Sequence, residues 1–344
     1  MKKNKLNIAV IGSSAMGISH MKGVVNNKNA NLYAVCDIDN EALNEAKTKY
    51  NVDIAVQDYK ELVNDKNVDA VIIVTPDQLH LEMTKAFLEA GKHVLCEKPM
   101  ALNMMECEEM MRIQHQTGNM LMIGQVCRCT PAFIMAKEIV DSGRIGDLFF
   151  VESEYAHNYE NAEGKNSWRK TPERSSFIGG GCHAVDLLRW IAGDPTEVTA
   201  YSNHKCMLDW PTDDCVIAIY KFPNNVIGKV FVSTGCRRDY TMRTVLYGTR
   251  GTIICDNTSP EIYLYTMDEP LADGKISYTH PQKLPVNINN HNVGAEIDQF
   301  VDAIINGNTS PVSPLEGAST VAVCCRTVES AAIGSTLKIN YPVY

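Results

Sequence analysis

The feature that most constrains the fold of this 344-residue chain is the alternation of short apolar segments with helical segments over its first 125 residues. Residues 70–74 (Ala-Val-Ile-Ile-Val) show no polar alternation, which is typical of a strand covered on both faces. Helical patterns such as 81–90 separate the apolar runs, which recur at 7–11, 32–37, 93–96 and 120–124. Strand-helix alternation of this kind predicts a parallel, doubly wound sheet of the Rossmann type.

From about residue 147 the pattern changes to strand-like segments that follow one another with few helices between them. The predicted strands are 148–155, 197–202, 215–222, 226–233, 243–247 and 252–255. Turns such as 222–225 join them, which favours an open, mostly antiparallel sheet with helices on one face. We therefore expect an α/β protein of two domains, 1–125 and 126–344, in which the second is an α+β domain.

Composition excludes several classes of protein. The formal net charge is −9 and no basic block is present, which argues against binding of nucleic acid. No run of about 18 apolar residues marks a membrane span. The basic start, Met1 to Lys5, lacks the longer apolar region of a signal peptide, so we expect a cytoplasmic protein.

The 12 cysteines do not have the spacing of a zinc site. No CxxC pair occurs, since Cys127 and Cys129 are two residues apart and Cys324 and Cys325 are adjacent. Several cysteines lie within apolar runs, so we interpret them as buried, reduced side chains and predict no bound metal.

The first predicted strand leads into a glycine turn that matches a dinucleotide phosphate site in part. A Rossmann fingerprint has three glycines, and here Gly12 and Gly17 occupy the outer positions while Ser14 stands at the middle one. Through Ala15 and Met16 the turn enters a helix, whose N-terminal N–H groups and partial positive charge suit phosphates. The alternative is a tight strand-helix turn that binds no ligand.

Asp37 strengthens the nucleotide interpretation because it stands at the end of the second strand, past the glycine turn. A carboxylate there can accept hydrogen bonds from the adenosine ribose hydroxyls and repel a 2′-phosphate, which favours NAD over NADP. The alternative role for Asp37 is that of a helix cap, which also suits the neighbouring Asp39.

Several segments resemble the Gfo/Idh/MocA family of oxidoreductases, which includes glucose-fructose oxidoreductase and inositol dehydrogenase. The matching segments are Val74 to His80, Ala90 to Pro99 with its Glu97-Lys98-Pro99 motif, Gly143 to Asp147, Ser167 to Arg169, Gly179 to Trp190 and Glu296 to Ile304. The resemblance extends over nearly the whole chain, and its combination of motifs is highly specific.

The resemblance implies an N-terminal NAD-binding domain and a C-terminal domain that binds substrate and forms a homodimer or homotetramer through its open sheet. The implied activity is oxidation or reduction of a secondary hydroxyl on a small-molecule sugar, inositol or related polyol. Lys98 corresponds to a lysine that contacts the substrate hydroxyl and the nicotinamide ribose, and its bond to Pro99 is expected to be cis. His183 corresponds to a proton donor or acceptor, with Asp186 placed to orient it or to cap the chain locally.

Further site residues follow from the resemblance and from side-chain chemistry. The predicted cofactor contacts besides the glycine turn and Asp37 are Thr75, Pro76, His80, Glu97 and Lys98. The predicted substrate contacts besides His183 and Asp186 are Arg128, Tyr155, Trp168 and Arg169. An indole can stack on a pyranose ring, and guanidinium groups donate to hydroxyls or to a carboxylate. A purely structural role is the alternative for each of these substrate contacts.

The lysine and the histidine suit alcohol oxidation. Removing a hydride from C–H requires the O–H proton to leave as well, and an alcohol is too weak an acid to lose it unaided. A neutral histidine with a pKa of about 6.5 can accept that proton, and a lysine ammonium stabilises the developing alkoxide. The nicotinamide carries the redox chemistry.

One position departs from the family pattern, because Gly179 stands where many members have an aspartate, four residues before His183. Either the histidine works alone or another group substitutes, with Tyr155, His157 and the cluster 237–240 as candidates. The departure leaves two alternatives to a dehydrogenase open. One is a glycoside-cleaving or lyase enzyme that oxidises its substrate transiently, and the other is a non-catalytic, nucleotide-sensing protein.

Overall fold

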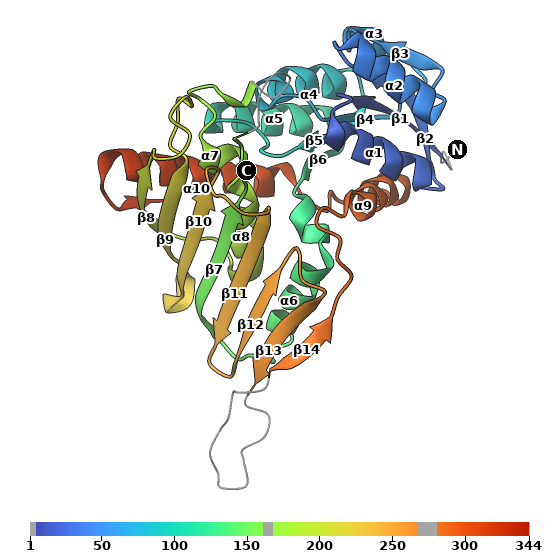
Figure 1. Ribbon diagram of the computed structural model, residues 1–344. Coiled ribbons are helices and arrows are strands. Elements are labelled where there is room, and N and C mark those ends of the chain that lie inside the picture. The colour runs from blue at the N-terminus through green and yellow to red at the C-terminus, as the bar shows by residue number, and fades with distance from the viewer. Residues whose placement is uncertain (1–4, 161–167, 267–280, 344) are drawn as a thin grey trace, which may run out of the picture. The chain divides into compact units, whose positions relative to one another are not determined.

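The computed structural model describes residues 5–160, 168–266 and 281–343 (Figure 1). The chain forms two compact units. The first combines residues 1–126 with 292–321 and 342–344, and the second combines 127–291 with 322–341. The chain therefore passes between the units several times, whereas the sequence pattern predicts a single boundary after residue 125.

The first unit contains a six-stranded sheet with the order β3-β2-β1-β4-β5-β6. Its strands are β1 (Leu6–Ile11), β2 (Ala30–Cys36), β3 (Ile54–Val56), β4 (Ala70–Ile73), β5 (His93–Glu97) and β6 (Leu121–Gly124). All neighbouring strands are parallel, and β4 pairs with β1 instead of continuing beside β3. The order therefore reverses between β1 and β4, which confirms the predicted doubly wound sheet.

Helices cover the sheet of the first unit, so its central strands are apolar without alternation. The connecting helices are α1 (Ala15–Asn26), α2 (Asn40–Tyr50), α3 (Lys60–Val63), α4 (His80–Glu89) and α5 (Met104–Thr117). All four residues of β4 are fully buried. Helix α9 (Val293–Asn306), far along the chain, packs against α1, where Gly23 leaves room for the side chain of Ile297.

The second unit is built on a nine-stranded sheet with the order β14-β13-β12-β11-β7-β10-β9-β8-β15 (Figure 1). Its strands are β7 (Leu148–Ala156), β8 (Glu197–Asn203), β9 (Cys215–Lys221), β10 (Ile227–Ser233), β11 (Thr241–Gly248), β12 (Gly251–Asp256), β13 (Glu261–Thr266), β14 (Gln282–Pro285) and β15 (Leu337–Lys338). The described pairings are antiparallel except for β7 with β10. The sheet is therefore mixed and mostly antiparallel, as predicted.

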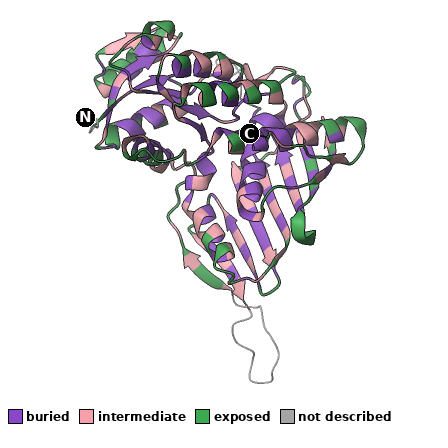
Figure 2. Cartoon of the chain, turned by 180° about the vertical axis from the view of Figure 1, so that it is seen from behind, coloured by how far each residue is buried: buried purple, intermediate pink, exposed green. Residues whose placement is uncertain are grey.

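Helices cover one face of this second sheet. Helix α8 (Cys182–Ala192) packs on β7 and β10, and α6 (Pro131–Asp141) packs on β12 and β13. The C-terminal half of α10 (Pro314–Ile333) reaches β9, where Thr327 and Tyr220 share a hydrogen bond of 2.7 Å. Burial alternates along the strands, and Figure 2 shows this banding. Ile217 and Ile219 point to the open face.

The described helices include none that combines the length and apolar character needed to cross a membrane.

Candidate cofactor and substrate sites

The predicted cofactor residues of the first unit follow the carboxyl ends of neighbouring parallel strands. Gly12 follows β1, Asp37 follows β2, Thr75 comes two residues after β4, and Lys98 follows β5. Parallel strands end at the same edge of a sheet, so these residues line one edge. Doubly wound sheets bind their ligands at this edge, where the strand order reverses.

The glycine turn fits a dinucleotide phosphate group even though Ser14 replaces the middle glycine. Gly12 has φ +105°, and a Cβ there would overlap the carbonyl of Val74. A Cβ on Gly17 would overlap the carbonyl of Gly12, so both outer glycines are required by close backbone packing. Ser14 is the N-cap of α1 but its side chain makes no capping hydrogen bond. The N–H groups of the first helical turn are therefore left for an anionic ligand.

Asp37 is fixed by the backbone beside this turn. Its Oδ2 accepts a hydrogen bond of 2.5 Å from the N–H of Ser13, and its Oδ1 accepts one of 2.9 Å from the N–H of Asp39. Asp39, and not Asp37, caps helix α2, since its Oδ1 accepts from Glu41 and Ala42. A carboxylate oxygen can accept more than one hydrogen bond, so the fixed carboxylate of Asp37 suits ribose hydroxyls.

His80 joins the segments that follow β4 and β5. Its Nδ1 lies 2.9 Å from the carbonyl oxygen of Pro99, and its Nε2 lies 3.3 Å from that of Thr75. Burial acts to lower the pKa of His80, but its interactions with Cys96 and the Pro99 carbonyl raise it to about 10. Two carbonyl acceptors agree with a doubly protonated ring. The peptide bond between Lys98 and Pro99 is cis, as predicted.

Three buried titratable side chains lie behind Lys98, which is itself half-buried. They are His20 of α1, Glu97 of β5 and Glu296 of α9, and one ligand-type atom of each lies within 4.8 Å of the others. Burial acts to raise the pKa of Glu97, but His20 and Lys98 hold it below its ordinary value. Burial and the neighbouring Glu97 raise the pKa of Glu296 well above its ordinary value, against the charge of Lys98.

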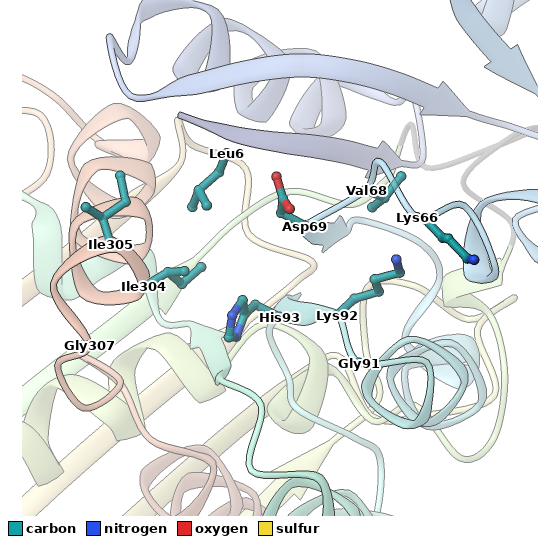
Figure 3. Close-up of a pocket in the computed structure, with 10 residues that line it drawn as sticks. All are labelled: Leu6, Lys66, Val68, Asp69, Gly91, Lys92, His93, Ile304, Ile305 and Gly307. Carbon is teal, nitrogen blue, oxygen red and sulfur yellow. The ribbon is translucent and has the colours of Figure 1, made fainter. Parts of the chain in front are cut away.

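A pocket of about 450 Å³ lies at the opposite edge of this sheet (Figure 3). Leu6 and His93, which begin β1 and β5, line it together with Asp69, which precedes β4. It is thus at the amino ends of the strands, and none of the predicted site residues lines it. We do not assign the cofactor to it.

In the second unit, His183 lies in the first turn of α8 within a group of aromatic side chains. It is only 2% exposed, and the ring of Tyr155 stacks on it with centroids 5.9 Å apart. The hydroxyl of Tyr155 contacts Nδ1 of His157 at 3.0 Å and the hydroxyl of Tyr159 at 2.7 Å. Burial, with a smaller effect from Tyr159, raises the pKa of Tyr155 well above its ordinary value, so this phenol stays protonated.

The other predicted substrate residues fall into two pairs. Asp186 accepts two hydrogen bonds from Arg128, at 2.8 and 2.9 Å, in a buried bidentate ion pair. Trp168 has the guanidinium of Arg169 over its ring at 4.3 Å. Ser167, the first residue of that motif, lies outside the described residues. The structure brings His183 together with Tyr155, while Asp186 is paired with Arg128.

The space at Gly179, where the family pattern has an aspartate, is filled by another side chain. A Cβ on Gly179 would overlap the guanidinium of Arg174, which is buried. The same guanidinium lies 4.8 Å from the ring centre of Trp168. The guanidinium of Arg174 therefore occupies the space in which the side chain of an aspartate at position 179 would begin.

Several residues that lie near His183 and near Lys98 were not predicted from the sequence. Cys127 was expected to be a buried hydrophobic residue, and its Sγ lies 3.3 Å from Nδ1 of His183. The ring of His291 lies beside that of His183 with centroids 5.4 Å apart, yet His291 belongs to no motif. His20 likewise stands outside every motif, whereas Glu296 begins one of the segments that carry the family resemblance.

Comparison with known proteins agrees with this architecture. Residues 6–125 match the family described as "Oxidoreductase family, NAD-binding Rossmann fold", and residues 133–254 match the GFO/IDH/MocA C-terminal domain. Together the two matches cover more than half of the chain.

Similar proteins include inositol 2-dehydrogenase 2 of Saccharopolyspora erythraea, 27% identical over 97% of this chain and 96% of that protein. A myo-inositol 2-dehydrogenase of Thermotoga maritima is 27% identical over 77% of this chain and 79% of its own. A solved levoglucosan dehydrogenase in complex with NADH has the same fold, with a TM-score of 0.88 and 23% identity over 98% of this chain and 100% of that one. The chain is a member of the GFO/IDH/MocA family of NAD-binding oxidoreductases.

Proposed function

We propose that this enzyme oxidises or reduces a secondary hydroxyl of a sugar, an inositol or a related polyol, with NAD as the hydride carrier. The observation that carries the proposal is the position of Lys98, directly past the carboxyl end of β5 and on the same sheet edge as Gly12 and Asp37. A lysine ammonium at the cofactor edge suits an alkoxide that develops next to a nicotinamide.

The chain's own residues would hold the cofactor at three points. The N-terminus of α1 and the N–H groups after Gly12 would bind the pyrophosphate, and Asp37 would accept from the adenosine ribose. Thr75, Pro76, His80 and Glu97 complete the set of residues at or beneath this edge. The bound nicotinamide would supply the hydride acceptor or donor.

Lys98 and His183 would act on the same substrate O–H group. Lys98 contributes a positive charge that stabilises the oxygen as its proton leaves, and His183 contributes the second group at that proton. Tyr155, stacked on His183 and hydrogen-bonded to His157 and Tyr159, would hold the imidazole plane. The buried ion pair of Arg128 and Asp186 would fix the position of side chains that line the substrate site.

A polyhydroxylated substrate is supported by the relatives and by the side chains of the second unit. Two similar proteins carry the name inositol dehydrogenase. The guanidinium groups of Arg169 and Arg174 lie 4.3 and 4.8 Å from the ring centre of Trp168, so an aromatic ring and guanidinium donors lie together here. An aromatic face of this type stacks on sugar rings, and the donors suit hydroxyl or carboxylate oxygens.

We also propose that the open face of the nine-stranded sheet joins copies of the chain into a homodimer or homotetramer. Tyr201, Ile217, Ile219 and Ile227 are exposed on strands β8, β9 and β10. Clustered apolar side chains on a sheet face are typical of a subunit interface.

The test of the function uses purified protein, NAD and a panel of inositols, aldoses and glycosides. We expect NADH fluorescence to report binding and at least one polyol to give reduced nicotinamide. Lys98→Met should lose turnover by a factor of about 10³ or more while still binding NADH. Lys85→Met, at a partly exposed position on α4, should retain wild-type activity.

Two outcomes would overturn the proposal. Full activity of Lys98→Met would remove the proposed role of that residue. A product formed from a glycoside without net nicotinamide reduction, by enzyme to which no NAD was added, would show instead a lyase that oxidises its substrate transiently.

A further inference from the structure

Three side chains from distant parts of the second unit converge on one point next to the aromatic group. They are Cys127 of the short helix η2 (Val126–Cys129), His183 of α8 and His291, which precedes α9. One ligand-type atom of each lies within 4.8 Å of the others. Cys127 and His183 are each 2% exposed, and His291 is half-buried.

The spacing of the three groups agrees with ligands of one tetrahedral ion. With zinc–sulfur and zinc–nitrogen bonds of ordinary length, tetrahedral angles put the sulfur and a nitrogen about 3.5 Å apart. Sγ of Cys127 and Nδ1 of His183 are 3.3 Å apart. Two imidazoles on such an ion have ring centres separated by about 5 Å. The rings of His183 and His291 have centroids 5.4 Å apart.

Hydrogen bonds outside the three ligands hold His291 in place. The hydroxyl of Tyr240 lies 3.2 Å from Nε2 of His291 and so fixes the plane of the ring. The preceding residue, Asn290, accepts hydrogen bonds from Thr130 at 2.7 Å and from Asn257 at 2.8 Å. Metal-binding histidines characteristically have such outer partners, which orient the ring toward the ion.

We propose that Cys127, His183 and His291 bind one first-row divalent metal ion of the zinc type. A thiolate with two imidazoles is a donor set that zinc prefers over the hard, oxygen-binding cations. The thioether sulfur of Met242 lies 3.5 Å from the Cys127 sulfur, but a thioether is a weak acceptor. We therefore expect an oxygen ligand at the fourth position of the ion. Three protein ligands and one exchangeable position are the arrangement of catalytic zinc sites.

This inference rests on the proposed function and replaces one step of it, because a His183 nitrogen that binds the ion cannot also accept the proton of the substrate hydroxyl. As a metal ligand it would act through the ion, whose charge lowers the pKa of a coordinated hydroxyl. The substrate C–H bond breaks with its electron pair passing to NAD⁺, the O–H proton leaves to water, and a carbonyl forms. Two electrons leave the alcohol and reduce NAD⁺ to NADH, so no further oxidant is needed.

The test uses protein without a histidine tag, stripped with a chelator and titrated with Co²⁺ or Zn²⁺. We expect about one equivalent to bind, and Co²⁺ to give a thiolate charge-transfer band in the near ultraviolet together with visible bands of tetrahedral cobalt. Cys127→Ser should lose the charge-transfer band and weaken binding by about 100-fold or more, and His291→Ala should weaken it similarly. Cys129→Ser, at a buried cysteine two residues away, is the matched control and should bind as the wild type does.

Thermal unfolding and NADH binding separate failure of this inference from failure of the proposed function. Zn²⁺ should raise the Tm of the wild type and of Cys129→Ser but not that of Cys127→Ser, while all three still bind NADH. Absence of stoichiometric binding to the wild type, or an unchanged cobalt spectrum in Cys127→Ser, would overturn the metal site alone. Full turnover of the stripped enzyme on an identified substrate would remove the catalytic role of the ion and leave the hydride chemistry intact.

Discussion

Nε2 of His20 lies 2.8 Å from Oε1 of Glu97, and both side chains are buried. The second oxygen of the same carboxylate accepts a hydrogen bond of 3.1 Å from the backbone N–H of Lys98. Glu97 therefore joins helix α1, which starts at the turn proposed to bind the cofactor phosphates, to the lysine proposed to contact substrate. We infer that this pair fixes the backbone at Lys98, with the carboxyl of Glu296 as its third member.

The carboxyl of Glu296 should make the stability of the wild type fall as pH rises above the ordinary pKa of a glutamate. Its pKa is raised, so its contribution to stability is present at low pH and is lost as pH rises through the folded-state pKa. The side-chain amide of the Glu296→Gln variant does not ionise. The Tm of this variant minus that of the wild type should therefore grow more positive as pH rises above 4.5, the ordinary pKa of the carboxyl. Differential scanning fluorimetry measures both, with exposed Glu89→Gln as the control, and parallel curves for Glu296→Gln and wild type would count against the assignment.

Asp37 should determine the choice between NAD and NADP. Replacing its carboxylate by the isosteric amide in Asp37→Asn keeps an acceptor for the Ser13 N–H but removes the charge that repels a 2′-phosphate. The ratio of kcat/KM for NAD over NADP should fall by about 100-fold, because juxtaposed like charges cost several kcal/mol. Asp39→Asn, which keeps a good cap for α2, should leave the ratio unchanged. An unaltered ratio in Asp37→Asn would place the ribose elsewhere.

Charges on the open sheet face should disrupt the proposed oligomer. Ile217 and Ile219 are 40% and 54% exposed on β9, so Ile217→Glu with Ile219→Glu changes little in the fold. A buried interface would have to desolvate both carboxylates, which costs several kcal/mol. Light scattering coupled to size exclusion should give a smaller particle than for the wild type, while Asn44→Glu, which adds a carboxylate at an exposed position of helix α2, serves as a comparison. A monomeric wild type would refute the interface.

The first sheet could be predicted from the sequence because its signals are local. Unbroken apolar runs such as β4 are found where helices cover both faces, and Gly12 stands where the backbone leaves no room for a Cβ. The pairing of β7 with β10 is parallel and non-local, since α7 (Ser176–Gly179), α8, β8 and β9 lie between them in the chain. Alternation alone indicates that these segments are strands but not which strands are neighbours.

The candidate sites were predictable only where a motif carried them. Lys98 and His183 stand in recognisable segments, but the partners of His183 come from segments that no spacing rule connects. Cys127 is 56 residues away from it and lies two residues from another cysteine, a spacing that does not indicate metal binding. The sequence suggests that Asp186 orients His183, whereas in the structure the Asp186 carboxylate accepts two hydrogen bonds from Arg128. Such pairings are decided by packing between elements and leave no local signal.

Transfer of deuterium from substrate to cofactor would show whether Lys98 takes part in hydride transfer from a secondary alcohol to NAD⁺. The polyol found to be turned over would be deuterated at the carbon that bears the reacting hydroxyl and mixed with NAD⁺ and wild-type enzyme or Lys98→Met. We expect the wild type to form singly deuterated NADH with the label at C4 of the nicotinamide, and Lys98→Met to form almost none. NADH without the label, or labelled NADH formed equally fast by Lys98→Met, would contradict this expectation.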